Sequence, residues 1–335
     1  MTSQDTLAMI WAGLLAVAVL AYVVLDGFDL GIGILFPWLG VGRERDAAMN
    51  SVAPVWDGNE TWLVLGGGGL FAAFPLAYAI LMPAVYAPLI AMLLGLVFRG
   101  VAFEYRWRTE RGRPFWDLAF AGGSTVAAFS QGVVLGAVLQ GITVHGRGYG
   151  GGRWDWLTPF TLLTGASIVA GYGLLGATWL ILKSEHELLD KAFRFARRFA
   201  VATVTAIALV SAVTPFLTHE YWRRWLAFPN VLATAQVPLL VVLVTTALFV
   251  SLRRRNERWP FPLALALFVL GYAGLGISLY PYLLPGTVTI WMAAAPAKSL
   301  GFMLVGASVL LPVIFAYTAY AYWVFRGKTA AEGYH

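Results

Sequence analysis

Pairs of carboxylates interrupt the first two apolar stretches of the sequence, and their types and spacing suit acid–base chemistry. Asp26 and Asp29 lie in Asp-Gly-Phe-Asp, and Asp57 and Glu60 repeat this spacing in Asp-Gly-Asn-Glu. Residues three positions apart share one face of a helix, so each pair presents two acids to one neighbour. An ionisable group inside a bilayer costs about 2.5–3.5 kcal/mol on insertion scales, so groups that are retained there usually pair or serve an ion pathway.

One arginine, Arg99, also lies inside an apolar stretch, with Glu104 shortly after it and Asp117 opening the next stretch. These acids outnumber the arginine, so a network of ion pairs would not balance its charge. Like charges and burial both favour the protonated form of a carboxyl group, which is the chemistry of a proton relay. The candidates for this relay are Asp26, Asp29, Asp57, Glu60 and Arg99.

A structural interpretation of the same residues stays open. Glu60, Glu104 and Asp117 suit an interfacial position, and the dipole of a helix favours an acid such as Asp117 near its start. Asp57 suits the N-cap of a helix. We favour the functional interpretation for Asp29, Asp57 and Arg99.

The histidines avoid the apolar stretches and fall in expected loops or the tail, at His145, His186, His219 and His335. Helical bundles build haem and metal sites from inward-facing histidines, and the chain has no cysteine. We therefore expect no metal or haem ligated by this chain. A methionine ligand at Met92 or Met303 is conceivable, although methionine in an apolar helix more often fills packing gaps.

The composition indicates that lipid covers much of the chain. Of 335 residues, 59% are hydrophobic and 12% charged, whereas soluble domains carry about 25% charged residues. A spanning helix needs roughly 20 apolar residues. Glycines inside the stretches, such as Gly173 and Gly176, are best explained by close helix packing. We expect one all-α polytopic membrane domain over residues 1–335, with about nine spans at 7–38, 60–78, 80–104, 117–141, 159–182, 198–217, 230–251, 260–283 and 299–325.

The basic residues predict the orientation. With the N-terminus outside, most of the 23 lysines and arginines fall in inner loops, as membrane proteins prefer. The outer loops hold only Arg147, Arg153, Arg223, Arg224 and Lys298. This N-out, C-in orientation explains the net charge of +6 without a nucleic-acid partner and puts the acids toward the cytoplasm.

Three ordered segments carry a family resemblance. They are Asp26-Gly-Phe-Asp-Leu-Gly-Ile-Gly33, Ala53-Pro-Val-Trp-Asp-Gly-Asn-Glu-Thr-Trp62 and Phe98-Arg-Gly-Val-Ala-Phe-Glu-Tyr-Arg106. They resemble the first three helices of subunit II of the cytochrome bd quinol oxidases, and the third segment is similar to the cyanide-insensitive branch. The rest of the chain resembles the family in length and span pattern.

The resemblance implies two four-helix bundles plus one peripheral helix, and a heterodimer with subunit I in the bacterial cytoplasmic (inner) membrane. In that family subunit I carries haems b and d and the quinol site, and the complex reduces dioxygen to water with quinol. Subunit II ligates no cofactor, supports assembly and provides part of the proton route. For this chain the resemblance implies Asp57 as a proton-route acid with Asp29 and Arg99 beside it, and Trp62 with Arg99 lining an oxygen passage.

Other interpretations stay open beside this one. A multi-pass proton-coupled transporter or channel also uses intramembrane acids and broken helices, and a purely structural assembly subunit is a third alternative. The sequence leaves open a structural quinone and a small accessory subunit. Val55 stands where some relatives have a histidine, so no role of that histidine transfers to this chain.

Overall fold

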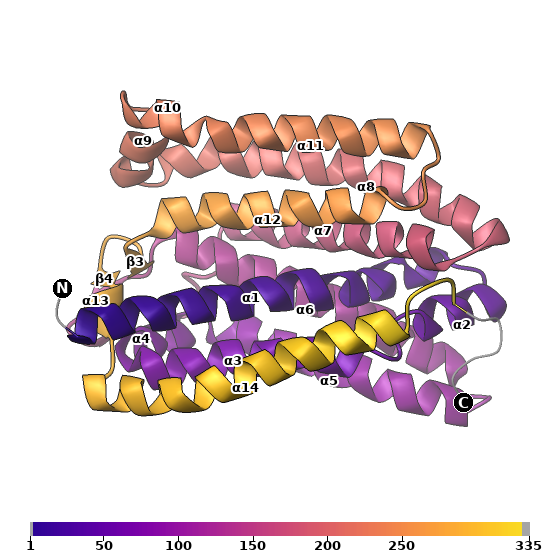
Figure 1. Ribbon diagram of the computed structural model, residues 1–335, viewed down its shortest axis with the longest axis horizontal. Helices are drawn as coiled ribbons and strands as arrows, with labels where there is room; N and C mark the ends of the chain where they lie inside the picture. The colour runs from indigo at the N-terminus through magenta and orange to yellow at the C-terminus, as the bar shows by residue number, and fades with distance from the viewer. Residues whose placement is uncertain (1–2, 330–335) are drawn as a thin grey trace.

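The computed structural model describes residues 3–329 and is built almost entirely from helices that run side by side (Figure 1). Within that range, eight helical segments are long and apolar enough to cross a membrane. The chain is therefore an all-α, multi-pass membrane protein. Residues 1, 2 and 330–335, which belong to the predicted single unit and include His335, lie outside the described residues.

The long helices form two groups of four and one further helix (Figure 1). The first group comprises α1 (Ser3–Leu35), α3 (Trp56–Ala73), α5 (Tyr86–Arg108) and α6 (Arg113–Gln140). The second comprises α7 (Pro159–Lys183), α8 (His186–Val213), α11 (Gln236–Arg253) and α12 (Pro260–Leu279). The last helix, α14 (Ala297–Val324), packs against α1 and α3. This arrangement matches the predicted two bundles plus one helix.

Short elements close the two ends of the molecule. At one end, which we call the α2 end, lie η1 (Phe36–Trp38) and α2 (Arg43–Asn50). The opposite, hairpin end holds α4 (Pro75–Ala84), β1 (Val144–His145), β2 (Gly148–Tyr149), η2 (Thr214–Phe216), α9 (His219–Trp225), α10 (Asn230–Thr234), β3 (Tyr282–Leu284), β4 (Val288–Thr289) and α13 (Ile290–Ala293). Both strand pairs are antiparallel, with Val144 opposite Tyr149 and Tyr282 opposite Thr289.

The second and third predicted spans, 60–78 and 80–104, have different bounds in the structure. α3 ends at Ala73, and Pro75 starts α4 as a separate short helix because proline lacks an N–H and its ring clashes with a preceding turn. With 18 residues, α3 is about 27 Å long, close to the hydrocarbon thickness of about 30 Å. Because its first turns are polar, α3 is not among the eight apolar segments. The predicted number of nine crossings is obtained only if α3 is counted as well.

Glycine brings the two bundles into backbone contact. A Cβ atom on Gly31 of α1 would lie 2.0 Å from the backbone oxygen of Tyr172 on α7, and one on Gly176 would lie 2.4 Å from the backbone carbon of Gly31. No side chain fits in that space, so the glycines set the distance between α1 and α7. The predicted packing role of Gly176 is confirmed, and that of Gly173 also, since its Cβ would meet Phe199 at 2.3 Å.

The last helix is the least covered. Leu300 is its one buried residue within the described chain, and Phe302, Val305 and Tyr317 are largely exposed. At the hairpin end, the Trp11 indole N–H donates to the Leu300 carbonyl oxygen at 3.0 Å. α14 therefore depends on a few polar anchors rather than on a broad apolar face.

Candidate proton-transfer site

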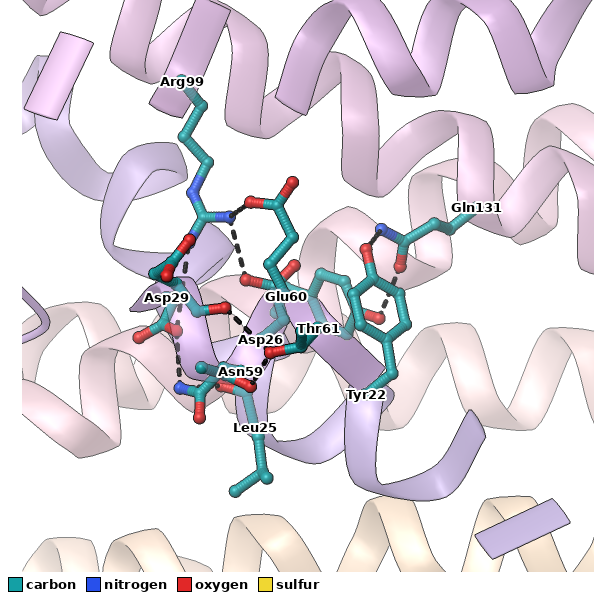
Figure 2. Close-up of polar contacts among 12 residues, drawn as sticks. Tyr22, Leu25, Asp26, Asp29, Asn59, Glu60, Thr61, Arg99 and Gln131 are labelled. Atoms are coloured by element: carbon teal, nitrogen blue, oxygen red, sulfur yellow. Dashed lines mark hydrogen bonds and ion pairs between the residues drawn. The ribbon is translucent and has the colours of Figure 1, made fainter. Parts of the chain in front are cut away.

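A buried arginine gathers three carboxylates from two helices (Figure 2). Arg99 of α5 has Nη1 at 2.9 Å from Asp26 Oδ1 and at 3.4 Å from Glu60 Oε2, and its Nη2 lies 3.9 Å from Asp29 Oδ2. The side chains of Arg99, Asp26 and Asp29 are 0% exposed, whereas that of Glu60 is 28% exposed. We call these four residues the acid cluster. Glu60 is its only member with access to the surface.

The helices place Arg99 through close packing and an aromatic wall. One turn before it, a Cβ atom on Gly95 would lie 2.7 Å from the backbone oxygen of Gly123, so α5 and α6 are in backbone contact. The rings of Trp56 and Phe103 stack with centroids 4.6 Å apart. The Arg99 guanidinium lies 5.7 Å from the first ring and 5.9 Å from the second. Aromatic faces attract a cation, so this wall helps to hold the guanidinium in its place beside the acids.

Two polar residues that sequence analysis missed complete the cluster. Asn59 Nδ2 donates to Asp29 Oδ2 at 2.7 Å and to the Leu25 carbonyl oxygen at 3.3 Å (Figure 2). The hydroxyl of Tyr322 on α14 donates to Asn59 Oδ1 at 2.9 Å. Asn59 lies within the Asp-Gly-Asn-Glu motif, which could have drawn attention to it. Nothing in the sequence points to Tyr322.

Several buried atoms of the cluster have no hydrogen-bond partner within the described residues. They are Asp26 Oδ2, Asp29 Oδ1 and Arg99 Nε, whereas Asp26 Oδ1 and Arg99 Nη2 keep the ion-pair contacts described above. A buried polar atom left without a partner costs about 1–3 kcal/mol. Ordered water bound between such groups would satisfy both the carboxylate acceptors and the guanidinium donor. The three carboxylates outnumber the single arginine, so the cluster contains groups on which a proton could reside.

A chain of neutral polar groups that includes Tyr22 and Gln131 lies next to the cluster (Figure 2). The Gln131 amide donates to the Tyr22 hydroxyl at 2.7 Å, and the Tyr172 hydroxyl donates to Gln131 Oε1 at 2.7 Å. Tyr22 precedes Asp26 by one turn of α1. These three residues link α1, α6 and α7, and none of them was among the predicted site residues.

The structure places two other predicted site residues outside the buried cluster. Asp57, in the first turn of α3, is exposed and lies one turn before Glu60. Trp62 is 2% exposed and packs with Ala18 and Tyr22, its ring 4.9 Å from that of Phe315. The rings that approach Arg99 are those of Trp56 and Phe103. The proton-route role of Asp57 and the oxygen-passage role of Trp62 remain predictions.

A second ionic cluster lies at the α2 end. Asp117 Oδ1 accepts from Arg106 Nε at 2.5 Å, and Asp117 Oδ2 accepts from Arg45 Nη1 at 2.7 Å. Arg106 Nη1 also lies 2.7 Å from Asp46 Oδ1. The expected span 80–104 ended before Arg106, whereas α5 continues to Arg108, and these pairs allow the charge of Arg106 to be buried at 1% exposure. Asp117 thus joins α2, α5 and α6, and it lies beyond the first turn of α6, where the helix dipole was expected to favour it.

Glu44 extends this ionic contact from α2 to the second bundle. Lys191 Nζ of α8 donates to Glu44 Oε1 at 2.6 Å and to Oε2 at 2.7 Å. Burial by itself opposes ionisation, but hydrogen bonds from Lys191 and from the Gly40 backbone N–H hold the pKa of Glu44 below its ordinary value. Glu104 differs, since it is exposed and pairs with Arg108 at 3.4 Å, one turn along α5.

The three histidines of the described residues lie at the ends of the molecule, as expected for loop positions. His145 and His219 are exposed in elements of the hairpin end, and His186 is exposed at the start of α8. Met92 packs in the main apolar core, and Met303 packs against the apolar cluster of the hairpin end. Within residues 3–329, no group of three or more His, Cys, Asp or Glu side chains is arranged to hold a metal ion.

Comparisons with known proteins match nearly the whole chain to one family. The family model for cytochrome bd terminal oxidase subunit II matches residues 7–325. The chain is 32% identical to cytochrome bd-I ubiquinol oxidase subunit 2 of Escherichia coli (strain K12) over 372 aligned residues, covering 99% of this chain and 97% of that protein. It is 27% identical to cytochrome bd ubiquinol oxidase subunit 2 of Bacillus subtilis (strain 168), covering 96% of each. Its fold is similar to a chain of the bd oxidase from Geobacillus thermodenitrificans, with a TM-score of 0.76, 18% identity, and coverage of 95% and 98%.

Proposed function

The chain belongs to the cytochrome bd terminal oxidase subunit II family, and from this premise we propose that it is the haem-free second subunit of a quinol:dioxygen oxidoreductase. The complex oxidises quinol and reduces dioxygen to water, and this subunit supports assembly and supplies protons. The observation that carries the proposal is the acid cluster, which is buried except at Glu60. The match of residues 7–325 to the family model favours this function over that of a proton-coupled transporter or channel.

The acids suggest an order for the proton route. Asp57 is exposed and Glu60, one turn later on α3, is partly buried, so they form the entrance. Glu60 then meets Arg99, which also holds Asp26. A proton entering at Asp57 passes to Glu60 and then to the oxygens of Asp26 and Asp29. The route continues into the partner subunit, where oxygen reduction consumes the protons.

The exposed acids also indicate the face that a partner covers. Asp57 and Glu60 lie on a helix that crosses the membrane, and an acid facing lipid is costly. Further along α3, Gly67 and Gly68 have open space where a Cβ would project. Small residues allow a helix of another subunit to approach closely. We assign this face to subunit I of the heterodimer, which excludes lipid from the entrance.

The orientation of the chain in the membrane agrees with this proton route. The α2 end collects the basic ends of α5, α8 and α11, so it faces the cytoplasm of a bacterial inner membrane. The N-terminus is then outside and the C-terminus inside. The entrance at Asp57 and Glu60 lies near the cytoplasm, where protons for water formation are drawn.

The cofactors belong to the partner in this proposal. Haems b and d supply the redox chemistry in subunit I, which also carries the quinol site, and the exposed positions of His145, His186 and His219 support this assignment. Nothing in the described residues assigns a structural quinone or an accessory subunit. Trp62 and Arg99 are proposed to line an oxygen passage, and the apolar packing of Trp62 against α1 and α14 supports this role.

The proposal is tested on the complex purified with its native partner. We expect a second multi-pass subunit that carries haem absorption to copurify with this chain. Asp57→Asn and Glu60→Gln each lower the oxygen-reduction rate per haem by about ten-fold or more, because they remove protonatable groups, while haem content stays unchanged. Glu104→Gln, an exposed acid paired with Arg108, serves as the matched control. Wild-type rates in both route variants would contradict the proton route, and a colourless particle without a partner would contradict the oxidase.

A further inference from the structure

The last helix reaches the acid cluster through one hydrogen-bonded chain. The Tyr322 hydroxyl donates to Asn59 Oδ1 at 2.9 Å, and Asn59 Nδ2 donates to Asp29 Oδ2 at 2.7 Å. Asn59 is 1% exposed, so water cannot replace either contact freely. Asp29 lies 3.9 Å from the Arg99 guanidinium, whereas Asp26 lies 2.9 Å away. Asn59 is therefore the closest polar group that orients Asp29.

The hydrogen-bond capacity of Asn59 requires the Tyr322 hydroxyl. In the observed orientation the amide nitrogen donates to two acceptors, the Asp29 carboxylate and the Leu25 carbonyl oxygen. The amide oxygen then needs a donor, and Tyr322 provides it. A flipped amide would turn its oxygen toward both acceptors. Tyr322 thus stabilises the orientation in which Asn59 donates to an ionised Asp29.

The position of Tyr322 is itself fixed by contacts with α1 of the first bundle and α7 of the second. Its ring lies 6.4 Å from the rings of Phe28 and Trp179, in edge-on geometry. Just beyond it, the Phe325 carbonyl oxygen accepts from Lys183 Nζ at 2.5 Å. Lys328 Nζ donates to the carbonyl oxygens of Ile181 and Ser184 and to Glu257, at 3.2, 2.8 and 2.6 Å. The end of α14 is therefore fastened to the end of α7, and these contacts keep the hydroxyl close to Asn59.

We propose that Tyr322 is a positioning residue for proton transfer, which acts through Asn59 to hold Asp29 in its proton-accepting orientation. This inference rests on the proposed proton route. It assigns to α14 a role in the chemistry as well as in packing. Displacement of α14, for example when the partner binds its exposed face, changes the orientation of Asp29 through the same two hydrogen bonds.

The experiment compares the pH dependence of turnover in the intact complex. Tyr322→Phe removes one oxygen atom and retains the ring contacts. The titratable groups that face Asp29 in every variant are Asp26 on α1, Glu60 on α3 and Arg99 on α5. Tyr22 on α1 and Tyr172 on α7 lie next to Asp26, and α6 presents the neutral Gln131. The Tyr322 hydroxyl on α14 is the one titratable group that the test variant removes. Matched controls are Tyr317→Phe and Tyr320→Phe, whose side chains are exposed on the same helix.

We expect Tyr322→Phe to lower turnover per haem about five-fold, as loss of one hydrogen bond to a buried acceptor implies. The acidic limb of its pH profile moves to higher pH, because an unsupported Asn59 no longer favours ionised Asp29. Asn59→Leu gives the same shift, and adding Tyr322→Phe to Asn59→Leu has no further effect. The infrared band of protonated carboxyl groups changes in Tyr322→Phe and stays unchanged in both controls.

Three outcomes overturn the inference. An unchanged pH profile and infrared band in Tyr322→Phe would show that the hydroxyl does not orient Asp29. Additive effects of Tyr322→Phe and Asn59→Leu would show that the two residues act separately. Loss of haem from both variants would show that Tyr322 and Asn59 serve assembly of the complex rather than proton transfer. If Asp57→Asn and Glu60→Gln slow turnover in parallel samples, the proton route stands while this inference fails. If neither variant slows turnover, the proposed proton route fails.

Discussion

The Arg99 guanidinium lies 2.9 Å from the Asp26 carboxylate, and neither side chain is exposed. Removing one partner of such a buried pair leaves an uncompensated charge, which typically costs about 3–5 kcal/mol. We therefore expect Arg99→Met to lower the thermal stability and the yield of the assembled complex strongly. Heat denaturation in detergent, followed by haem absorption and light scattering, measures this loss.

The matched control for that substitution is the double variant Arg99→Met with Asp26→Asn. It removes one of the carboxylates that Arg99→Met leaves unpaired, so it recovers part of the stability. Equal stability of Arg99→Met and wild type would show that the carboxylates are protonated or hydrated without help from the arginine.

Gly31→Ala is expected to prevent proper packing of α1 on α7. Its Cβ atom would lie 2.0 Å from a backbone oxygen, and overpacking of this kind costs about 1–3 kcal/mol or more. Gly13→Ala on the same helix meets nothing within 4 Å and serves as the control. The measurement is the amount of folded subunit in membranes. Comparable amounts for the two variants would mean that α1 and α7 separate at little cost.

The contact between Glu44 and Lys191 predicts a pH-dependent contribution to stability. Because the pKa of Glu44 is lowered in the folded chain, the stabilisation is fully present above its unfolded value of about 4.3 and is lost as the pH falls through the folded value. At neutral pH, Lys191→Met lowers stability by about 1 kcal/mol or less. The difference from wild type disappears in strong acid, as melting curves over a pH series would record.

Glu44→Gln provides the control for this pair. In that background, Lys191→Met has no further effect at any pH if the two side chains act on each other. A Lys191→Met penalty that persists in Glu44→Gln would assign the contribution of Lys191 to other groups.

Trp62→Phe tests the proposed oxygen passage. The indole N–H of Trp62 has no hydrogen-bond partner within the described chain, so replacing it with phenylalanine leaves no new unpaired group. We expect the assembled complex to keep its haem content and its rate at saturating oxygen, while its KM for oxygen changes. Oxygen-electrode traces at low oxygen give this KM. An unchanged KM for oxygen would show that Trp62 does not line the oxygen passage.

Hydropathy predicts most of the fold because lipid demands long apolar helices at every crossing. It failed between α3 and α5, where Pro75 and Phe74 lie in a continuous apolar run. The extent of that run suggested that the second span reached residue 78, yet a backbone break separates α3 from α4. Hydropathy measures where lipid is tolerated, whereas the end of a helix depends on local backbone geometry.

The acid cluster was predictable in part. Asp26, Asp29, Glu60 and Arg99 were recognisable as costly groups in apolar surroundings, and the structure brings them together. The exposed position of Asp57 was not predictable, because it depends on which face of α3 turns toward α1. The contact between Tyr322 and Asn59 joins residues that are distant in the sequence. An isolated tyrosine in an apolar helix gives no sign of such a contact.

The Tyr322–Asn59 hydrogen bond joins a residue synthesised early to one synthesised near the end of translation. Until α14 enters the membrane, Asn59 Oδ1 lacks its tyrosine donor, and the Lys183 ammonium lacks the Phe325 carbonyl. A ribosome that stops before residue 322 therefore leaves a polar gap inside the bilayer. Such a gap distinguishes unfinished chains from finished ones, so the proteases that remove defective membrane proteins have a physical difference to recognise.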